Sequence, residues 1–425
     1  MKKVLIISYY WPPSGGAGVQ RWLKLSKYLA KSNVEAHILT VDPKKASYTS
    51  IDNSLTQDIH PKIIVHYSDS FEIINYYSKL AGKKNVPTAG FSNVNNSSVI
   101  QKAVNALRSN LFIPDPRKGW KKYAVKKAIE IIKEYSIHSI ITTSPPHSTQ
   151  LIGLELKKRL SINWIVDFRD PWTDIYYYKL LRHTAISAKI DQKLEKKVIE
   201  QSDRIITVSN GFKSIFLNKT EKVKEEKFSV IPNGFDPDDF KEKSKTQSSI
   251  EQFIICYTGT MSTQYNPFIF FDALNDCKKD NILLQIVGTT SAEIKKYIEQ
   301  LKLNVEYVET VPHEQVSKIQ QQSDLLLLVI PDVKLSEGIT PGKLFEYMAS
   351  GNQTIALGPE NSDVNQILKE CNAGKTFDRN DKSKITDYIL NLITRKVESN
   401  YPKIDSVALS HYSRKNQAEQ IRQLL

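Results

Sequence analysis

The chain has 425 residues and a formal net charge of +13, and its 40% hydrophobic and 25% charged residues are typical of a folded globular protein. One hydrophobic core rarely serves a chain of this length, so we expect two domains. Apolar runs such as residues 325–330 are too short to span a bilayer, and three widely separated cysteines argue against a thiolate metal site and indicate a cytoplasmic protein.

The first half of the chain alternates short apolar runs, typical of buried strands, with segments of helical periodicity. The expected strands are residues 3–8, 35–40, 63–67, 139–143, 163–168 and 204–208, and the expected helices are residues 19–31, 118–135, 149–160 and 185–201. Residues 69–98 interrupt this pattern with Gly, Pro, Asn and Ser, and we expect a mobile surface insertion there. The alternation predicts a doubly wound parallel sheet of the α/β class.

A polar, highly charged segment at residues 232–249 marks a domain boundary, after which the pattern restarts. The expected strands of the second half are residues 253–257, 282–287, 305–309, 325–329 and 353–357. We expect an N-terminal domain at residues 1–235 and a C-terminal domain at residues 250–404, with a C-terminal helix near residues 405–425 that can pack back on the first domain. Ligands of such sheets bind beyond the carboxyl ends of the strands, so function is expected in those loops.

The first of these loops, residues 11–18, follows the first expected strand and contains Gly15, Gly16 and Gly18. Glycine lets backbone N–H groups approach an anionic ligand where a helix begins. The loop does not match the dinucleotide fingerprint G-x-G-x-x-G, so a tight turn without a ligand remains the alternative.

The segment SEGITPGKLFEYMASG at residues 336–351 follows a strongly apolar strand. It predicts a helix that begins near Pro341 and ends before Gly351. Thr340, or the backbone N–H groups of Gly342 and Lys343, would face a phosphate at the start of this helix.

Two charged side chains support that interpretation. Lys343 lies in the first helical turn, where a cation opposes the helix dipole unless an anion is bound. Glu346, one turn further, can accept hydrogen bonds from two ribose hydroxyls. The alternative is a surface helix with an ordinary charge pair.

Several motifs in a fixed order extend the argument to most of the chain. They are VLIISYYWPPSGGAGVQRWLKLSKYL, ITTSPPHST, IVDFRDPWTD, the NGF pair at Asn210 and Asn233, YTGTM from Tyr257, VPHEQV from Val311, and SEGITPGKLFEYMASG. Together they resemble the GT-B glycosyltransferases, in particular family 4, whose retaining enzymes build bacterial surface polysaccharides. The resemblance implies two Rossmann-like domains facing each other across a cleft, and sugar transfer from a nucleotide-diphosphate sugar to a glycan or lipid-linked acceptor.

The resemblance also implies roles for individual residues. The expected donor-binding residues are Gly15, Gly16, Gly259, Thr260, Thr340, Pro341, Gly342, Lys343 and Glu346, with Glu346 on the ribose. The expected catalytic residues are His147, Asp170 and Lys343, and the expected acceptor-side residues are Arg21, Asp167 and Arg169.

Each of these residues also has a structural alternative. His147 follows two prolines and can simply cap the next helix. Asp167, Arg169 and Asp170 can form an ion pair at a strand end. For Arg21, which begins a helix, we expect a solvated side chain more than an acceptor contact.

Two departures from the family pattern matter. The family's glutamate pair has seven residues between its members, whereas eight lie between Glu337 and Glu346, so we expect only Glu346 to contact the donor. The loop at residues 259–265 lacks the cation of many relatives, so Lys343, Arg169 or Arg21 would have to balance the diphosphate. Without such a cation the chain would be a catalytically silent scaffold, and a nucleotide-sugar epimerase is the other alternative.

The positive charge permits three partners: an anionic membrane, a phosphorylated substrate or nucleic acid. No nucleic-acid-binding motif accompanies the charge, so we expect no specific nucleic acid. Trp120 and Phe112 lie beside the basic helix at residues 118–135 and could form a peripheral membrane or lipid-acceptor surface, but aromatic residues at such spacing more often belong to the core. We expect no metal or other cofactor, because we expect no D-x-D motif to hold a divalent ion and because Lys343 and the helix start can stabilise the leaving diphosphate.

Overall fold

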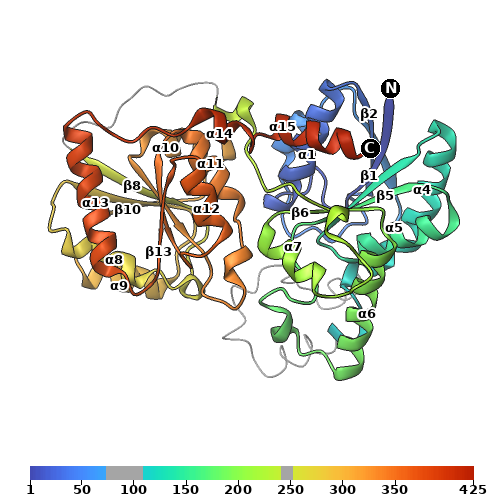
Figure 1. The fold of residues 1–425 in the computed structure, drawn as a ribbon, viewed down its shortest axis with the longest axis horizontal. Coiled ribbons are helices and arrows are strands. Elements are labelled where there is room, and N and C mark those ends of the chain that lie inside the picture. The colour runs from blue at the N-terminus through green and yellow to red at the C-terminus, as the bar shows by residue number, and fades with distance from the viewer. Residues whose placement is uncertain (73–108, 241–251) are drawn as a thin grey trace. The chain divides into compact units, whose positions relative to one another are not determined.

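The computed structural model describes residues 1–72, 109–240 and 252–425, which fold into two compact units (Figure 1). The N-terminal unit comprises Met1–Pro232 and Gln417–Leu425, and the C-terminal unit comprises Asn233–Asn416. Most of the insertion expected at residues 69–98 and part of the linker expected at residues 232–249 lie outside the described residues.

The N-terminal unit contains a seven-stranded parallel sheet in the order β3-β2-β1-β4-β5-β6-β7. Its strands are β1 (Lys2–Ile7), β2 (Val34–Val41), β3 (Ile64–Ser68), β4 (Ser139–Ser144), β5 (Asn163–Phe168), β6 (Arg204–Thr207) and β7 (Phe228–Val230). Its longer helices are α1 (Ala17–Lys31), α4 (Lys121–Tyr135), α5 (Ser148–Arg159), α6 (Ala185–Gln201) and α7 (Asn210–Leu217). The chain switches from one half of the sheet to the other between β1 and β4, so the loops after these two strands lie side by side.

The C-terminal unit contains a six-stranded parallel sheet in the order β10-β9-β8-β11-β12-β13. Its strands are β8 (Phe253–Thr258), β9 (Ile282–Val287), β10 (Val305–Val308), β11 (Leu325–Val329), β12 (Gln353–Leu357) and β13 (Gly374–Phe377). Its helices are α8 (Phe268–Asp276), α9 (Ala292–Gln300), α10 (His313–Gln322), α11 (Gly342–Ser350), α12 (Asp363–Glu370), α13 (Lys382–Val397) and α14 (Ser406–Ser410). Here the switch lies between β8 and β11.

Strand β11 shows why this sheet is buried on both faces. Leu325, Leu327 and Val329 belong to an apolar cluster that includes α8, α9 and α13, while Leu326 and Leu328 belong to a second cluster with α11 and α12. A continuous run of leucine is therefore what a central strand covered on both sides requires. The two parallel-sheet α/β units expected from the sequence are confirmed.

The last helix, α15 (Arg414–Leu424), contributes Ala418 and Ile421 to the core of the N-terminal unit. Lys2 Nζ also donates to the Arg422 carbonyl at 2.8 Å, so the end of the chain is fixed to its first strand.

Trp120 is fully buried, and its indole N–H donates to Ser68 Oγ at 2.8 Å. The core position that the spacing favoured for Trp120 is therefore confirmed and the membrane-facing alternative is wrong, because the ring fills the core beside β3. No helix in the described part of the chain combines the length and apolar composition needed to cross a bilayer.

Candidate functional site

In the C-terminal unit, α11 begins at the switch point of the sheet. The chain leaves β11, passes a short 3-10 turn at Ser336–Gly338 and enters the helix after Pro341, whose N-cap position has no side-chain hydrogen bond. The first backbone N–H groups of a helix have no acceptor within it and carry partial positive charge. The helix ends at Gly351, which has a left-handed φ of 91°. Its uncapped amino end is therefore suited to bind an anion.

Lys343 reaches from this helix to the end of β8. Its ammonium donates to the Tyr257 hydroxyl and to the Thr258 carbonyl, both at 3.1 Å, and lies 4.3 Å from the centre of the Tyr257 ring. Burial lowers the pKa of Lys343 to about 8, and the Glu346 carboxylate opposes that shift. The cation is thus partly desolvated and held by neutral groups.

The loop after β8 is the loop that lacks a cation in the sequence. A Cβ atom placed on Gly259 would lie 3.4 Å from Lys343 Nζ, so the ammonium of Lys343 is adjacent to that loop. Of the three cations that could balance a diphosphate there, Lys343 is the one that the structure brings to it. Arg169 and Arg21 belong to the N-terminal unit.

Two glycines with positive φ shape the turns after β8 and β9. Gly259 has φ of 111° and Gly288, after β9, has φ of 117°. A Cβ on Gly288 would lie 2.6 Å from the Gly259 carbonyl oxygen, so the two turns pack backbone against backbone. Gly259 and Thr260 remain exposed, which leaves their backbone accessible to a ligand.

The other predicted donor residues lie on or just before α11. Glu346 is half-buried one turn after Lys343, whereas Glu337 is exposed in the 3-10 turn. Thr340 is buried, and its carbonyl accepts from the Asn233 side-chain amide at 3.3 Å. Asn233 therefore helps to fix the backbone just before α11, a role that its NGF motif alone did not reveal.

In the N-terminal unit, the glycine loop lies at the switch point between β1 and β4. Gly15 donates its N–H to the Ser50 carbonyl at 3.0 Å, and a Cβ there would meet Ser50 Oγ at 2.9 Å. Gly16 is exposed at the N-cap of α1, with φ of 91° and no side-chain cap. The loop is therefore built around glycine, and the amino end of α1, like that of α11, has no side-chain cap.

Arg169 joins this loop to the end of β4. Its guanidinium donates to the carbonyl groups of Gly18, Ser144 and Pro145, the latter two at 3.0 and 3.2 Å. Burial lowers the pKa of Arg169, with neighbouring carboxylates opposing the shift. Because Nε, Nη1 and Nη2 of Arg169 each donate to a carbonyl group, Arg169 links the glycine loop to the segment that follows β4.

Arg21 and Asp167 form a buried ion pair. The Arg21 side chain is 1% exposed, the Asp167 side chain is 0% exposed, and Arg21 Nη2 lies 3.0 Å from Asp167 Oδ1. Asp167 also accepts from the Trp22 indole at 2.7 Å and from Thr143 Oγ1 at 2.8 Å. The expectation of a solvated Arg21 is wrong, because the guanidinium also donates to two carbonyl groups that follow β7. Asp167 pairs with Arg21 rather than with its sequence neighbour Arg169.

His147 stands at the start of α5 with its imidazole ring stacked on Trp172, at a centroid distance of 4.9 Å and an interplanar angle of 9°. Burial, helped by the positive charges of Arg169 and Lys219, lowers the pKa of His147 to about 3, so the ring is neutral at pH 7. Its Nδ1 is buried and has no hydrogen-bond partner among the described residues.

The side chain of His147 makes no cap hydrogen bond. Instead Asp115 accepts from the Ser148 backbone N–H at 2.7 Å and from its hydroxyl at 2.9 Å. The sequence reasoning missed Asp115, because 33 residues separate it from the helix that it caps.

Asp170 is half-buried three residues beyond Asp167. Burial raises the pKa of the Asp170 carboxyl, while Arg169 acts in the opposite direction. Its environment therefore favours proton uptake more than that of an exposed aspartate.

The expectation that the chain lacks a D-x-D spacing, which is common at metal sites of other transferases, is wrong, because this spacing occurs at Asp236-Pro237-Asp238. Asp236 is buried and accepts from the Asp238 backbone N–H at 3.0 Å, so it caps a 3-10 turn. Among residues 1–72, 109–240 and 252–425, no three His, Cys, Asp or Glu side chains converge as a metal site would require.

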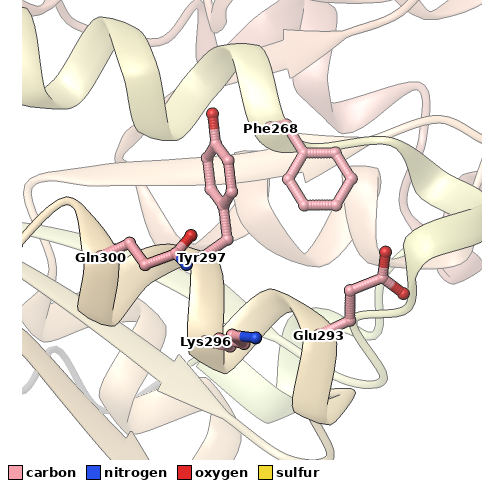
Figure 2. Close-up of a pocket in the computed structure, with 5 residues that line it drawn as sticks. All are labelled: Phe268, Glu293, Lys296, Tyr297 and Gln300. Atoms are coloured by element: carbon pink, nitrogen blue, oxygen red, sulfur yellow. The ribbon is translucent and has the colours of Figure 1, made fainter.

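A hollow of about 380 Å³ lies between α8 and α9 (Figure 2). Its lining residues are Phe268, Glu293, Lys296, Tyr297 and Gln300. The rings of Phe268 and Tyr297 meet edge to face at 4.9 Å, and none of the predicted site residues lines this hollow. The hollow is therefore separate from the site formed by Lys343 and the Gly259 turn.

Comparisons with known proteins agree with this architecture. The model of the family described as glycosyltransferase family 4 matches residues 15–239, and that described as glycosyl transferases group 1 matches residues 238–405. No curated protein sequence matches the chain.

Solved structures of similar fold cover the whole chain. Anabaena HepE in complex with UDP has a TM-score of 0.64 at 13% identity, with 100% of this chain and 99% of HepE covered. Sucrose-phosphate synthase from Thermosynechococcus elongatus has a TM-score of 0.61 at 14% identity, with 100% and 98% covered. An E. coli structure described as trehalose-6-phosphate bound with UDP-2-fluoro glucose has a TM-score of 0.60 at 12% identity, with 100% and 99% covered. At these identities the likeness shows the fold alone.

Proposed function

Because the chain belongs to glycosyltransferase family 4, we propose that it transfers a sugar, with retention of configuration, from a nucleoside-diphosphate sugar to a glycan or lipid-linked acceptor in surface polysaccharide synthesis. The observation that carries the proposal is the position of the Lys343 ammonium, beside the exposed Gly259 turn and one turn before Glu346. A cation, an uncapped helix start and a carboxylate match the diphosphate and the ribose of such a donor.

In this proposal the donor diphosphate binds at the amino end of α11 and along the Gly259–Thr260 backbone, while Glu346 accepts hydrogen bonds from the ribose. The acceptor hydroxyl oxygen bonds to the anomeric carbon of the sugar as the C–O bond between that carbon and the diphosphate breaks, and the electron pair of the broken bond moves onto the diphosphate. Lys343 and the helix N–H groups stabilise the charge that develops there, a task that a divalent ion performs in other transferases. We therefore propose transfer without a metal ion.

On the acceptor side we propose His147 and Asp170, with Arg169, Arg21 and Asp167 positioning the loops around them. The neutral imidazole of His147 can donate or accept one hydrogen bond without adding charge to the site. Asp170, whose carboxyl pKa is raised by burial, is the better candidate to take the acceptor proton.

The direct test begins with a thermal-shift series of nucleoside diphosphates, in which UDP is the first probe because two of the similar structures hold UDP or a UDP-sugar. A ligand at a free concentration of about a hundred times its Kd stabilises a protein by about 2.7 kcal/mol, so a clear rise in Tm is expected. Incubation of the best nucleotide-sugar with EDTA and a glycan acceptor should then release the nucleoside diphosphate and form a glycoside. An isomerised sugar without release of the diphosphate would point to an epimerase, and no Tm rise with any diphosphate would point to a scaffold.

The pKa of Lys343 predicts how diphosphate binding depends on pH. Since burial lowers this pKa to about 8, the ammonium is mostly charged at pH 7 and mostly neutral at pH 9.5. If binding requires the charged form, the affinity for UDP should fall by about tenfold or more between these values. Isothermal titration calorimetry at several pH values measures the fall.

Lys343→Ala is the control for this dependence. It should bind UDP with nearly pH-independent affinity over the same range and should slow turnover more than it weakens binding. An unchanged pH profile in Lys343→Ala would exclude Lys343 as the titrating group.

A further inference from the structure

The most exposed large apolar side chains of the N-terminal unit include two on α6. Ile186 is 74% exposed and Ile190, one turn later, is 46% exposed. Leu180 and Tyr176, in the turn that precedes the helix, are also exposed. Single exposed apolar residues are ordinary, but four within 15 residues of the chain form a candidate contact surface.

The same segment is strongly basic at its surface. Its cations are Lys179, Arg182, Lys189, Lys193, Lys196 and Lys197, and none forms an ion pair with a described residue. Lys189 and Lys193 alternate with the two isoleucines at helical spacing, so they share one face of α6.

The acidic residues of the segment do not offset this charge at the surface. Between residues 175 and 199 they are Asp191 and Glu195, and both are buried. Asp191 accepts from the Trp172 indole at 2.8 Å and from the Tyr178 hydroxyl at 2.9 Å, while Glu195 pairs with Lys219 Nζ at 2.7 Å. The third acid of α6, Glu200, is half-buried and accepts from the Thr220 hydroxyl at 2.8 Å. The exposed side chains of α6 therefore include lysines and isoleucines but no acid.

We propose that this surface, formed by Tyr176, Leu180, Ile186, Ile190 and the surrounding lysines of α6, binds peripherally to an anionic lipid bilayer. Isoleucine and leucine side chains enter the boundary between headgroups and acyl chains, and tyrosine is favoured at that level. Lysines remain beside the phosphate groups and add electrostatic attraction. A protein partner would fit the apolar residues but gives no reason for the exposed lysines that share a helix face with them.

Helix α4 provides the contrast that makes the proposal specific. It carries five lysines against four on α6, but its exposed face also carries Glu130 and Glu134, and Lys127 pairs with Glu130 at 3.4 Å. None of the exposed large apolar residues belongs to α4. Helix α4 therefore has exposed lysines without exposed apolar side chains, and substitutions on it serve as the matched control for those on α6.

The test is sedimentation of the full chain with vesicles of phosphatidylcholine, alone or with about one third phosphatidylglycerol. We expect binding to the anionic vesicles only, weakening with added salt. Ile186→Ser/Ile190→Ser and Lys189→Glu/Lys193→Glu should each weaken this binding by about tenfold or more. Lys122→Glu/Lys126→Glu on α4 carries the same charge change and should retain most of it.

Three outcomes would overturn the proposal. These are no binding of the wild type to anionic vesicles, equal losses in the α4 and α6 lysine variants, and a loss confined to the lysine variants with the isoleucine variant unchanged. Because all substituted side chains are exposed, circular dichroism should show folded variants, and their UDP affinity reports separately on the donor site. Failure of vesicle binding is therefore distinguishable from failure of the proposed sugar transfer.

Discussion

Glu346→Ala is expected to weaken binding of the nucleotide-sugar donor by about a hundredfold or more, while the protein remains folded. Two hydrogen bonds from ribose hydroxyls to a carboxylate contribute about 1.5–3 kcal/mol each, which corresponds to losses of this order. Glu346 is only half-buried, so its removal opens no cavity in the core. Calorimetric titration with the donor identified by thermal shift measures the loss.

The chain offers a matched control for this substitution. Glu337 is exposed in the turn before α11, and Glu337→Ala should leave donor affinity within about twofold of the wild type. Equal affinity in both variants and the wild type would remove Glu346 from the site.

Glu346→Ala should also change the titration of Lys343. The Glu346 carboxylate raises the pKa of Lys343 against the effect of burial, so its loss leaves the ammonium less stable. The midpoint of the pH dependence of UDP binding should therefore move to lower pH in Glu346→Ala. A midpoint unchanged from the wild type would show that the two side chains do not interact in solution.

The sequence predicted the frame of both sheets because central strands buried on both faces are continuous apolar runs, as in residues 325–329. It did not predict β7 and β13, which have three and four residues and contain too few apolar positions to be distinguished from loops. Trp120 shows the same limit for side chains, since an aromatic residue beside lysines belongs more often to a core than to a membrane surface, but the sequence does not decide between them until its partner Ser68 is known.

The sequence located the candidate donor residues but could not predict how they meet. Lys343 contacts Thr258, 85 residues earlier, because β8 and β11 are neighbours in the sheet and α11 follows β11. Periodicity describes one segment at a time, so it cannot reveal a contact that depends on strand order. For the same reason a charged residue on α1 was expected to be solvated, although Arg21 has a partner 146 residues away.

Removal of the Asp167 charge, the partner of Arg21, is expected to have the largest effect on stability. Asp167→Asn should lower the free energy of unfolding of the N-terminal unit by about 3–5 kcal/mol, because it leaves the buried Arg21 guanidinium without its counter-charge. Trp22 and Thr143 would also lose a carboxylate acceptor. In urea unfolding of the full chain, the transition of the N-terminal unit should move to lower concentration while that of the C-terminal unit stays in place.

Asp170→Asn, three residues later, is the matched control that distinguishes an effect on the stability of the fold from an effect on turnover. Burial raises the pKa of Asp170, so its folded-state pKa lies above that of the unfolded chain and its charged form destabilises the fold as pH rises through these values. Asp170→Asn should therefore leave stability unchanged or slightly higher at pH 7, yet reduce turnover if Asp170 takes the acceptor proton. Asp167→Asn should instead lower activity only as far as the protein unfolds, and adding Arg21→Met to it should cost less than the sum of the two single changes. If Asp167→Asn were as stable as Asp170→Asn, the buried pair would not support the N-terminal unit, and Asp167 would return to the candidates for direct contact with the acceptor.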